Sequence, residues 1–480
     1  MNMKRHFFTL FSAIVLLNLG GCNKKIGNNI TPTTPSVSTA FPIQIWTTSA
    51  NKFALLQSAG TDFTPTKDVN FATITVDENQ KFQTVDGFGY TLTGGSATLI
   101  NKLDAKAKAD LLQELFSNKD NAIGINYLRI SIGASDLSTS VFSYDDLPNG
   151  ATDVTLSKFN LSQDTIDLIP ILKQILTINP SLKILASPWS PPTWMKTNND
   201  SKGGNLKPEY YAVYAQYFVK YIQQMRALGI PIDAVTLQNE PHHGGNNPSM
   251  ILNAPEAIDF VKNHLGNAFK IANITTKIIV WDHNCDEPDY PISVLNDAAA
   301  KAFINGSAFH LYNGDISALS KVYAAHPDKD LYFTEQWTGS KGDFGGDLMW
   351  HLKNVIIGSM RNRSKTALEW NLANDAAFEP HTVGGCTECK GALTIQNQSI
   401  TRNVSYYIIA QVSKFVPTGS VRIASDIVGK LQTVAFKTPN GKTVLIVLNE
   451  GKTTEFFNIS SANKWITTSM NGESAATYIW

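Results

Sequence analysis

The segment DTIDLIPILKQILTINPSLKILAS, residues 164–187, contains the unit that decides the fold. Its first part, Asp164 to Leu176, has the spacing of an amphipathic helix. The apolar positions that define this spacing are Ile166, Ile169, Leu172, Ile175 and Leu176. The run Leu182 to Ser187 that follows is typical of a short buried strand. A helix leading into such a strand is the repeating unit of a parallel sheet.

The same unit recurs through the middle of the chain, where eight short β-type runs alternate with helical stretches such as 105–116, 210–228 and 254–272. The eight runs are residues 84–90, 127–132, 182–187, 234–238, 277–281, 308–310, 331–334 and 367–370. An open doubly wound sheet of this length usually carries a phosphate-binding loop, and the glycines at Gly87, Gly89, Gly94 and Gly95 lack the required spacing. The sequence therefore predicts an α/β protein with a closed (β/α)8 TIM barrel.

Both ends of the chain are rich in strand-like runs instead. Strands are expected at 43–47, 52–56 and 72–76, and again at 429–438, 443–449, 454–457 and 465–469. We expect one antiparallel β-sandwich side domain built from both termini, residues 41–82 and 413–480. The catalytic barrel then occupies residues 83–412.

The composition excludes several classes of protein. Lysine plus arginine count 40 and aspartate plus glutamate count 40, so the basic surplus that a nucleic-acid binder needs is missing. Four cysteines in 480 residues are too few for a disulfide scaffold, so the fold must depend on its hydrophobic core.

The N-terminus has the layout of an export signal. Lys4 and Arg5 precede an apolar run that ends in Leu19-Gly20-Gly21-Cys22. This pattern predicts a lipoprotein signal peptide over 1–21, lipidation of Cys22 and a flexible tether over 22–40. A plain signal peptide is the alternative, and a transmembrane helix would need about 20 apolar residues. We expect an exported protein, lipid-anchored to a bacterial membrane at the cell surface or in the periplasm.

Two glutamates follow strands of the predicted barrel, at the end where barrel enzymes place their active sites. Asn239-Glu240-Pro241 follows the fourth strand and Glu335-Gln336-Trp337 follows the seventh. Each glutamate alone could be a salt-bridge partner or a helix cap, but a pair of carboxylates is what glycoside hydrolysis requires. Five tryptophans at or near strand ends favour a carbohydrate cleft, namely Trp189, Trp194, Trp281, Trp337 and Trp370.

A set of further strand-end motifs makes a resemblance specific. The motifs are Asp86-Gly-Phe-Gly89, Leu128-Arg-Ile-Ser131, the segment SPWSPPTWMK at 187–196, Trp281-Asp282, His310-Leu-Tyr312, Thr334-Glu335 and Glu369-Trp-Asn-Leu372. With Asn239-Glu240-Pro241 they resemble glycoside hydrolase family 30, which includes glucosylceramidases and β-1,6-glucanases. The resemblance extends from about Phe41 to the C-terminus and implies the same barrel and sandwich.

The resemblance also implies roles for individual residues. Glu240 is expected to be the acid/base and Glu335 the nucleophile. Asn239 would hold the sugar 2-hydroxyl, and Arg129 would keep Glu335 ionised by lowering its pKa. Tyr312 would contact the nucleophile. The other sugar-binding residues implied are Asp136, Trp189, Trp370 and Asn371.

The remaining cysteines allow several interpretations. Cys386-Thr-Glu-Cys389 could be a zinc half-site, a redox pair or a small disulfide. Zinc needs four ligands and only His381 lies nearby, so in an exported protein we expect a disulfide that staples a loop at the rim. Cys285 then stays a free, buried thiol. We expect neither a metal nor a cofactor.

Together these features predict a retaining β-glycosidase that cleaves β-linked glucan, with β-1,6-glucan preferred. Residues 368–389 contain no lysine or arginine, so the cationic clamp of family members that cut glucuronate-substituted xylan is missing. The alternatives are an exo-acting β-glucosidase, β-xylosidase or glucosylceramidase of the same family, and a catalytically silent carbohydrate-binding lipoprotein. The expected partners are a polysaccharide or oligosaccharide, and a membrane only through the anchor. Nucleic acid is not expected, and the chain is expected to be a monomer.

Overall fold

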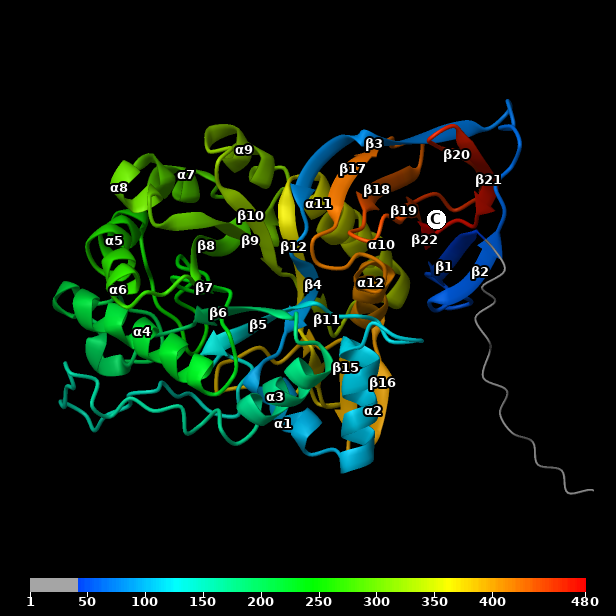
Figure 1. Cartoon of the computed structure of the whole chain (residues 1–480). Coiled ribbons are helices and arrows are strands. Elements are labelled where there is room, and N and C mark those ends of the chain that lie inside the picture. The colour runs from blue at the N-terminus through cyan, green and yellow to red at the C-terminus, as the bar shows by residue number, and fades with distance from the viewer. Residues whose placement is uncertain (1–41) are drawn as a thin grey trace, which may run out of the picture. The chain divides into compact units, whose positions relative to one another are not determined.

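The computed structural model describes residues 42–480, and the expected signal peptide, Cys22 and tether lie outside them. Eight parallel strands close into a barrel in the order β10-β12-β4-β5-β6-β7-β8-β9 (Figure 1). The strands are β4 (Gly87–Thr91), β5 (Tyr127–Ile132), β6 (Lys183–Pro188), β7 (Ala234–Thr236), β8 (Lys277–Cys285), β9 (Ile304–Gly314), β10 (Asp330–Glu335) and β12 (Ser364–Asn371). The predicted TIM barrel is thereby confirmed, with one strand at each of the eight β-type runs.

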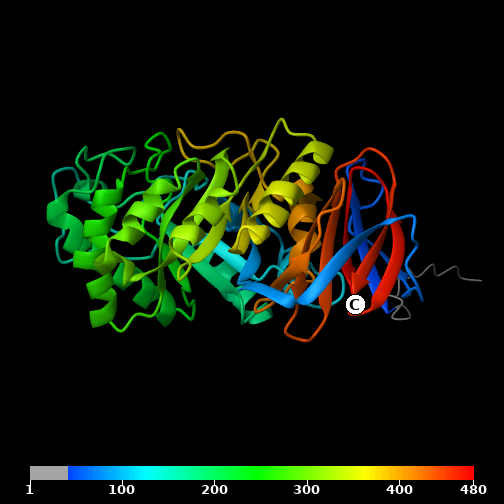
Figure 2. The same ribbon diagram turned by 90° about the horizontal axis from the view of Figure 1, so that it is seen from above.

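Helices surround the barrel, as the view from above shows (Figure 2). They are α1 (Gly94–Asn101), α2 (Ala105–Phe116), α3 (Leu168–Ile178), α4 (Tyr211–Ala227), α5 (Ala254–Asp259), α6 (Gly266–Ile271), α7 (Asp289–Asn296), α8 (Ala298–Lys301), α9 (Ala318–Ala325), α10 (Phe344–His351), α11 (Ser359–Arg361) and α12 (Val404–Ser413). Short helical segments add η1 (Thr193–Met195), η2 (Pro208–Tyr210), η3 (Phe260–Leu265) and η4 (Leu352–Gly358). Of these, η3 and η4 are π-helical, so the helix predicted over 254–272 is interrupted at η3.

One predicted helix begins later than expected. Helix α3 starts at Leu168, and Ile166 lies ahead of it with 64% of its surface exposed. This start places Pro170 in the first turn, where a missing backbone N–H costs nothing. Ile166 therefore does not belong to the buried face of the helix.

The two chain ends form one nine-stranded sheet in the order β2-β1-β22-β19-β18-β17-β3-β20-β21. Its strands are β1 (Ile43–Ser49), β2 (Gln57–Thr61), β3 (Ala72–Thr84), β17 (Val421–Ser425), β18 (Leu431–Lys437), β19 (Thr443–Asn449), β20 (Glu455–Ser461), β21 (Lys464–Met470) and β22 (Ser474–Ile479). Thr64, just after edge strand β2, bridges to Trp465 in the opposite edge strand β21. The sheet thus folds over a core of its own as a β-sandwich.

The sandwich differs from the sequence-based expectation at three strands. The run 52–56 is a turn rather than a strand, because Lys52 and Leu56 adopt positive φ angles of 63° and 51°. Strands β17 and β22 were not expected. Helix α12 joins the barrel to the sandwich, where the Gln411 side chain hydrogen-bonds to Thr48 at 2.7 Å and to Thr477 at 2.8 Å.

Two small sheets complete the described chain. Strand β11 (Thr338–Gly339) pairs with β14 (Cys389–Lys390), and β13 (Ala373–Asn374) joins β15 (Leu393–Gln396) and β16 (Ser399–Arg402). Both sheets use the segments that follow β10 and β12, so they fix the loops at the C-terminal end of the barrel. Among the described helices, none is long and apolar enough to cross a bilayer.

Candidate active site

Arg129, in the middle of β5, lies at the centre of the site and is fully buried. Its Nη1 donates to Glu335 Oε2 at 2.6 Å, and its Nη2 donates to Asn239 Oδ1 and to Asp282 Oδ2, both at 2.7 Å. A planar guanidinium presents its donors to these three acceptors in a fixed geometry, whereas the three donors of an ammonium group rotate on a flexible stem. Arg129 therefore orients both the expected nucleophile and the expected sugar-binding amide.

Glu335 and Glu240 lie close together. One oxygen of each carboxyl and a ring nitrogen of His310 all lie within 4.8 Å of one another. Tyr312 donates from its hydroxyl to Glu335 Oε1 at 2.9 Å. Glu240 itself has a φ of 47°, a backbone conformation that non-glycine residues adopt at a cost and that is concentrated at functional sites.

His310 in β9 and Asp282 in β8 also belong to the site, although no role was expected for either of them. His310 Nδ1 lies 3.1 Å from Glu240 Oε1, and its Nε2 lies 3.2 Å from Asp282 Oδ1. Burial lowers the pKa of His310, but Glu335, Asp282 and Glu240 outweigh this effect and raise the pKa to about 9. Burial raises the pKa of Asp282, but Arg129 and His310 bring it far below its ordinary value. At neutral pH His310 is thus a cation and Asp282 an anion.

The pKa values of the two glutamates shift in opposite directions. Burial raises the pKa of Glu335, and His310 and Arg129 oppose this rise without cancelling it. Burial also acts on Glu240, but the hydrogen bond and charge of His310 bring its pKa below the ordinary value. The expectation that Arg129 gives Glu335 a low pKa is therefore wrong for the net shift, although Arg129 does act in that direction. Carboxyls this close titrate as a pair.

Two tryptophans and one aspartate form a wall beside Arg129. The Trp189 and Trp370 rings stack with centroids 5.5 Å apart, and the guanidinium lies 4.7 Å from the first centroid and 5.8 Å from the second. Asp136 is buried beside the glutamates. Burial, together with the charges of Glu335 and Glu240, raises its pKa to about 7.

Three other side chains differ from what the sequence suggested. Asn371 is buried, and its Oδ1 accepts hydrogen bonds from Ser96 at 2.8 Å and Thr93 at 3.2 Å, so this oxygen is already occupied. Trp194 donates to the Asp145 backbone, and Trp281 donates to the Asn284 backbone, both from buried positions. The indole N–H groups of these two tryptophans are therefore used within the protein.

The cysteine loop supports the same wall. Cys386 and Cys389 are disulfide-bonded and pack with Trp189 and Trp370, whereas Cys285 is free and buried. The backbone N–H of Cys386 acts to lower the pKa of the Asp136 carboxyl, against the effect of burial. The Thr382 N–H donates to the Asp136 backbone oxygen at 2.9 Å. The disulfide loop therefore fixes Asp136 from outside the barrel.

Among the described residues, the trio Glu240, His310 and Glu335 is the group whose spacing could hold a metal ion. The protonated His310 and the Arg129 guanidinium on Glu335 both repel a cation at this point. The chemistry of the trio fits proton transfer and nucleophilic attack better than metal binding.

The spacing of the two glutamates defines the class of enzyme. Inverting glycosidases hold their carboxyls about 6.5–9.5 Å apart to admit a water, whereas retaining enzymes hold them about 5–5.5 Å apart for direct attack. One oxygen of Glu240 lies within 4.8 Å of one oxygen of Glu335 at the mouth of a TIM barrel, which favours the shorter spacing, that of a retaining glycoside hydrolase.

Comparison with known families gives the same answer. Residues 85–416 match the glycosyl hydrolase family 30 TIM-barrel domain, and residues 419–478 match the glycosyl hydrolase family 30 beta sandwich domain. The chain belongs to glycosyl hydrolase family 30, and the resemblance drawn from the sequence motifs is confirmed.

Individual relatives are enzymes of two kinds. The chain is 34% identical over 440 residues to an endo-1,6-β-D-glucanase of Aspergillus fumigatus, covering 85% of this chain and 87% of the relative. It is 30% identical over 434 residues to the lysosomal acid glucosylceramidase of Mus musculus, covering 85% and 83%. The solved structure of the endo-β1,6-glucanase BT3312 superposes with a TM-score of 0.86 at 35% identity, covering 91% of this chain and 99% of that one.

Proposed function

We propose that this protein hydrolyses internal β-1,6 bonds of glucan with retention of configuration. The observation that carries the proposal is the buried pair Glu240 and Glu335, within 4.8 Å and oriented by Arg129. The linkage is inferred from the relatives, because the endo-1,6-β-glucanases match at 34–35% identity and high coverage.

Glu335 acts as nucleophile and Glu240 as acid and then base. Arg129, His310, Asp282 and the two glutamates would carry two positive and three negative charges if fully ionised, and one shared proton makes the buried group neutral. Both Glu335 oxygens already accept hydrogen bonds, from Arg129 and Tyr312. These hydrogen bonds favour the ionised Glu335 that the attack requires, but the raised pKa of Glu335 and the lowered pKa of Glu240 place the shared proton on Glu335 in the free site. The reactive state is therefore the one in which this proton has moved to Glu240.

The reaction proceeds in two displacements. Glu335 attacks the anomeric carbon while Glu240 gives its proton to the leaving glycosidic oxygen, which forms a covalent glycosyl-enzyme. Glu240, now ionised, takes a proton from water, and the resulting hydroxide displaces Glu335. Asn239 is held by Arg129 through its oxygen, so its amide N–H groups are left to donate to the sugar 2-hydroxyl. Asp136 and Trp370 bind the same sugar ring.

A panel of linkage-defined β-gluco-oligosaccharides and a long β-1,6-glucan tests this assignment. We expect turnover of β-1,6 oligomers and early release of mixed oligomers from the polymer. Release of glucose alone would favour the exo-acting alternative. Activity confined to glucosylceramide or to β-xylosides would replace the glucanase with that family member. Binding without turnover would indicate the silent carbohydrate-binding alternative.

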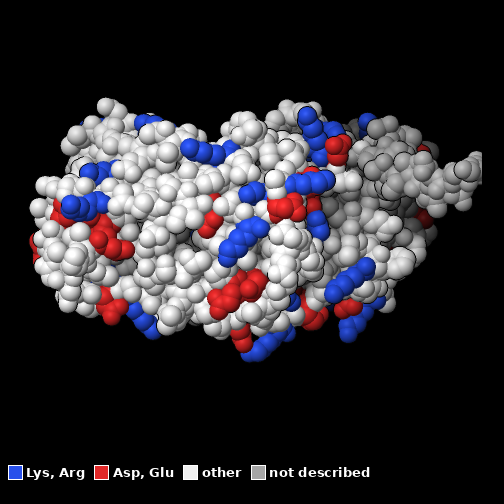
Figure 3. Space-filling model, turned by 90° about the horizontal axis from the view of Figure 1, so that it is seen from below, with Lys and Arg blue, Asp and Glu red and all other residues white. Residues whose placement is uncertain are grey.

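We further propose that the protein is exported and lipid-anchored through Cys22, and that it meets the membrane only through this anchor. It would act as a monomer and would not bind nucleic acid. Acidic and basic residues are interspersed over the face in Figure 3, in keeping with equal counts of 40 and 40.

Mass spectrometry of the mature N-terminus provides the test of the anchor. A diacylglyceryl group on Cys22, lost in Cys22→Ala, is the expected result, and an unmodified terminus at another residue would contradict it.

A further inference from the structure

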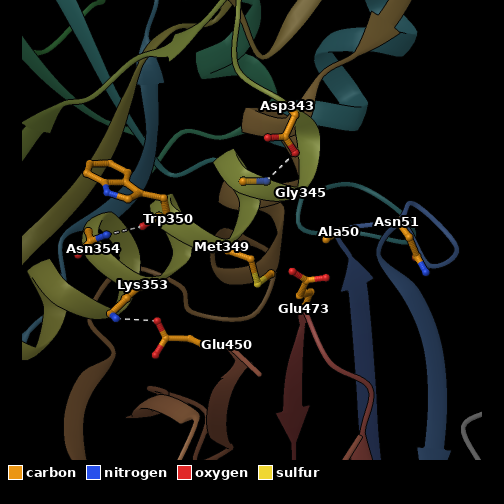
Figure 4. A pocket seen from close by; sticks show the side chains of 11 residues that line it. Ala50, Asn51, Asp343, Gly345, Met349, Trp350, Lys353, Asn354, Glu450 and Glu473 are labelled. Carbon is orange, nitrogen blue, oxygen red and sulfur yellow. Dashed lines mark hydrogen bonds and ion pairs between the residues drawn. The ribbon is translucent and has the colours of Figure 1, made fainter. Parts of the chain in front are cut away.

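A second cavity lies between barrel and sandwich, apart from the glutamates. Its volume is about 790 Å³, which is within the range of small-molecule sites. Helix α10 and segment η4 line one side (Figure 4). Turns of the sandwich line the other side, through Ala50 and Asn51 after β1, Glu450 after β19 and Glu473 before β22. Residues from both domains thus form its walls.

Trp350 is the distinctive side chain of this cavity. It is 41% exposed, and it is the tryptophan among the exposed large apolar residues of the described chain. A half-exposed indole in a concave surface leaves a flat apolar face in contact with water. The C–H face of a pyranose ring is the natural complement to such a surface.

Polar groups at the other end of the lining from the indole have unused hydrogen-bonding capacity (Figure 4). The Asn51 oxygen accepts bonds from Ser49 at 2.8 Å and from the Phe53 N–H at 3.0 Å, which leaves its amide N–H groups free to donate. Glu473 is exposed, and its carboxylate projects toward the centre of the lining (Figure 4). These donors and acceptors match the hydroxyl groups of a sugar.

The charges of the cavity disfavour an anionic ligand. Asp343, Glu450 and Glu473 contribute three carboxylates, and the single lysine of the lining, Lys353, is paired with Glu450 at 2.6 Å. A uronate or a sulfated glycan would meet an uncompensated negative field here. A neutral, hydroxyl-rich chain meets no such penalty.

We propose that this cavity is a second carbohydrate-binding site, with Trp350 as its platform, for a neutral β-linked glucan chain. The inference rests on the proposed glucanase function. A second contact on the same polymer raises its effective concentration at the barrel mouth without changing the chemistry there. The site should therefore matter for long chains and not for short oligomers.

Kinetics on two substrate lengths provide the first test. Trp350→Ala should raise KM for long β-1,6-glucan by about fivefold and leave kcat/KM for short oligomers within about twofold. Trp350→Tyr keeps a flat ring and should restore most of the polymer affinity. Phe456→Ala, which removes another exposed aromatic ring outside the cavity, is the matched control.

Binding to the inactive Glu335→Gln protein, measured by retardation in glucan-containing gels, separates this site from catalysis. A loss of retardation in the double variant Trp350→Ala/Glu335→Gln, insensitive to added salt, is expected. Unchanged retardation with every neutral β-glucan, or binding abolished by salt as for a cationic ligand, would overturn the proposal. If the wild-type protein fails to hydrolyse β-1,6 oligomers, the proposed function is wrong. The retardation of Glu335→Gln and of Trp350→Ala/Glu335→Gln by a series of neutral glucans then still tests whether the second site exists.

Discussion

The two ends of the barrel both bury charged side chains, but they balance the charges in opposite ways. At the N-terminal end, Asp86 lies 2.7 Å from Lys183, 3.8 Å from Lys277 and 4.0 Å from Lys365. These lysine side chains are 26%, 26% and 19% exposed, so their ammonium groups reach water. Asp233 and Asp330, each 3.2 Å from one of these lysines, complete the cluster, so cations and acids are balanced there at little cost.

At the C-terminal end, acids outnumber cations and water is excluded. The side chains of Arg129 and Asp282 are fully buried, and that of Glu335 is 7% exposed. Burying this excess of negative charge costs folding free energy unless a proton or a bound substrate neutralises it. We infer from this difference that the cluster around Asp86 stabilises the barrel, whereas the cluster around Arg129 supplies the charged groups of the reaction.

The largest expected effect on the C-terminal charge cluster comes from replacing the nucleophile, Glu335. Glu335→Gln should lower kcat by about 10⁴-fold or more on every substrate, because no covalent intermediate can form. Thermal unfolding should change little, since Gln keeps the side-chain shape beside Arg129. Steady-state kinetics with long β-1,6-glucan would measure the loss, and near-normal turnover would remove Glu335 from the mechanism.

A smaller but more diagnostic effect is expected at Arg129. Arg129 opposes the rise in the pKa of Glu335, so Arg129→Lys, which keeps the charge and loses the planar fork, should let this pKa rise further. The acidic limb of kcat/KM should then move to higher pH by about one unit, with a rate loss of about tenfold or more. If a folded Arg129→Lys protein keeps both its rate and its acidic limb, Arg129 does not tune the nucleophile.

The disulfide loop should affect substrate binding more than chemistry. Replacing Cys386 and Cys389 together by Ser frees the loop whose N–H groups hold Asp136, so KM should rise several-fold while kcat falls less. Cys285→Ser, at the free buried cysteine, is the control. Thiol counts on the mature protein should give one thiol without reductant and three with reductant in the unfolded state. Equal KM for the reduced and oxidised enzyme would show that the loop does not position Asp136.

At the other end of the barrel the expected effect is on stability alone. Asp86→Asn removes the anion 2.7 Å from Lys183, while Lys277 and Lys365 keep Asp233 and Asp330 at 3.2 Å. The substitution should cost about 1 kcal/mol of unfolding free energy, while kcat stays unchanged. Asp110→Asn, which breaks the exposed pair with Lys106, should cost much less. Denaturant unfolding measures both variants. A loss of kcat in Asp86→Asn would mean that the two ends are coupled.

Local patterns were sufficient to predict the barrel and its two glutamates. Each barrel strand is a short apolar run; Glu335 is the last residue of β10, and Glu240 lies in the loop that follows β7. The pairing of the chain ends was harder to foresee. Strand β22, Ser-Ala-Ala-Thr-Tyr-Ile, has weak local strand character and is defined by its neighbours β1 and β19, which lie far apart in sequence.

The hydrogen-bond network around the two glutamates could not be predicted from local sequence patterns either. Asp282 and His310 follow the same strand-end pattern as Glu240, and that pattern could have identified them as candidates. Their role depends on distances between β8, β9 and β5 that no single segment encodes. The raised pKa of Glu335 likewise arises from complete burial beside other acids, which sequence spacing does not report.

The most direct test is to trap the glycosyl-enzyme in Glu240→Gln. With an aryl β-glucoside whose leaving group needs no proton, the first displacement should still occur. The second should stall because the base is missing. Peptide mapping by mass spectrometry should then locate the sugar on Glu335. A sugar on another residue, or no adduct together with an α-configured first product, would contradict the account.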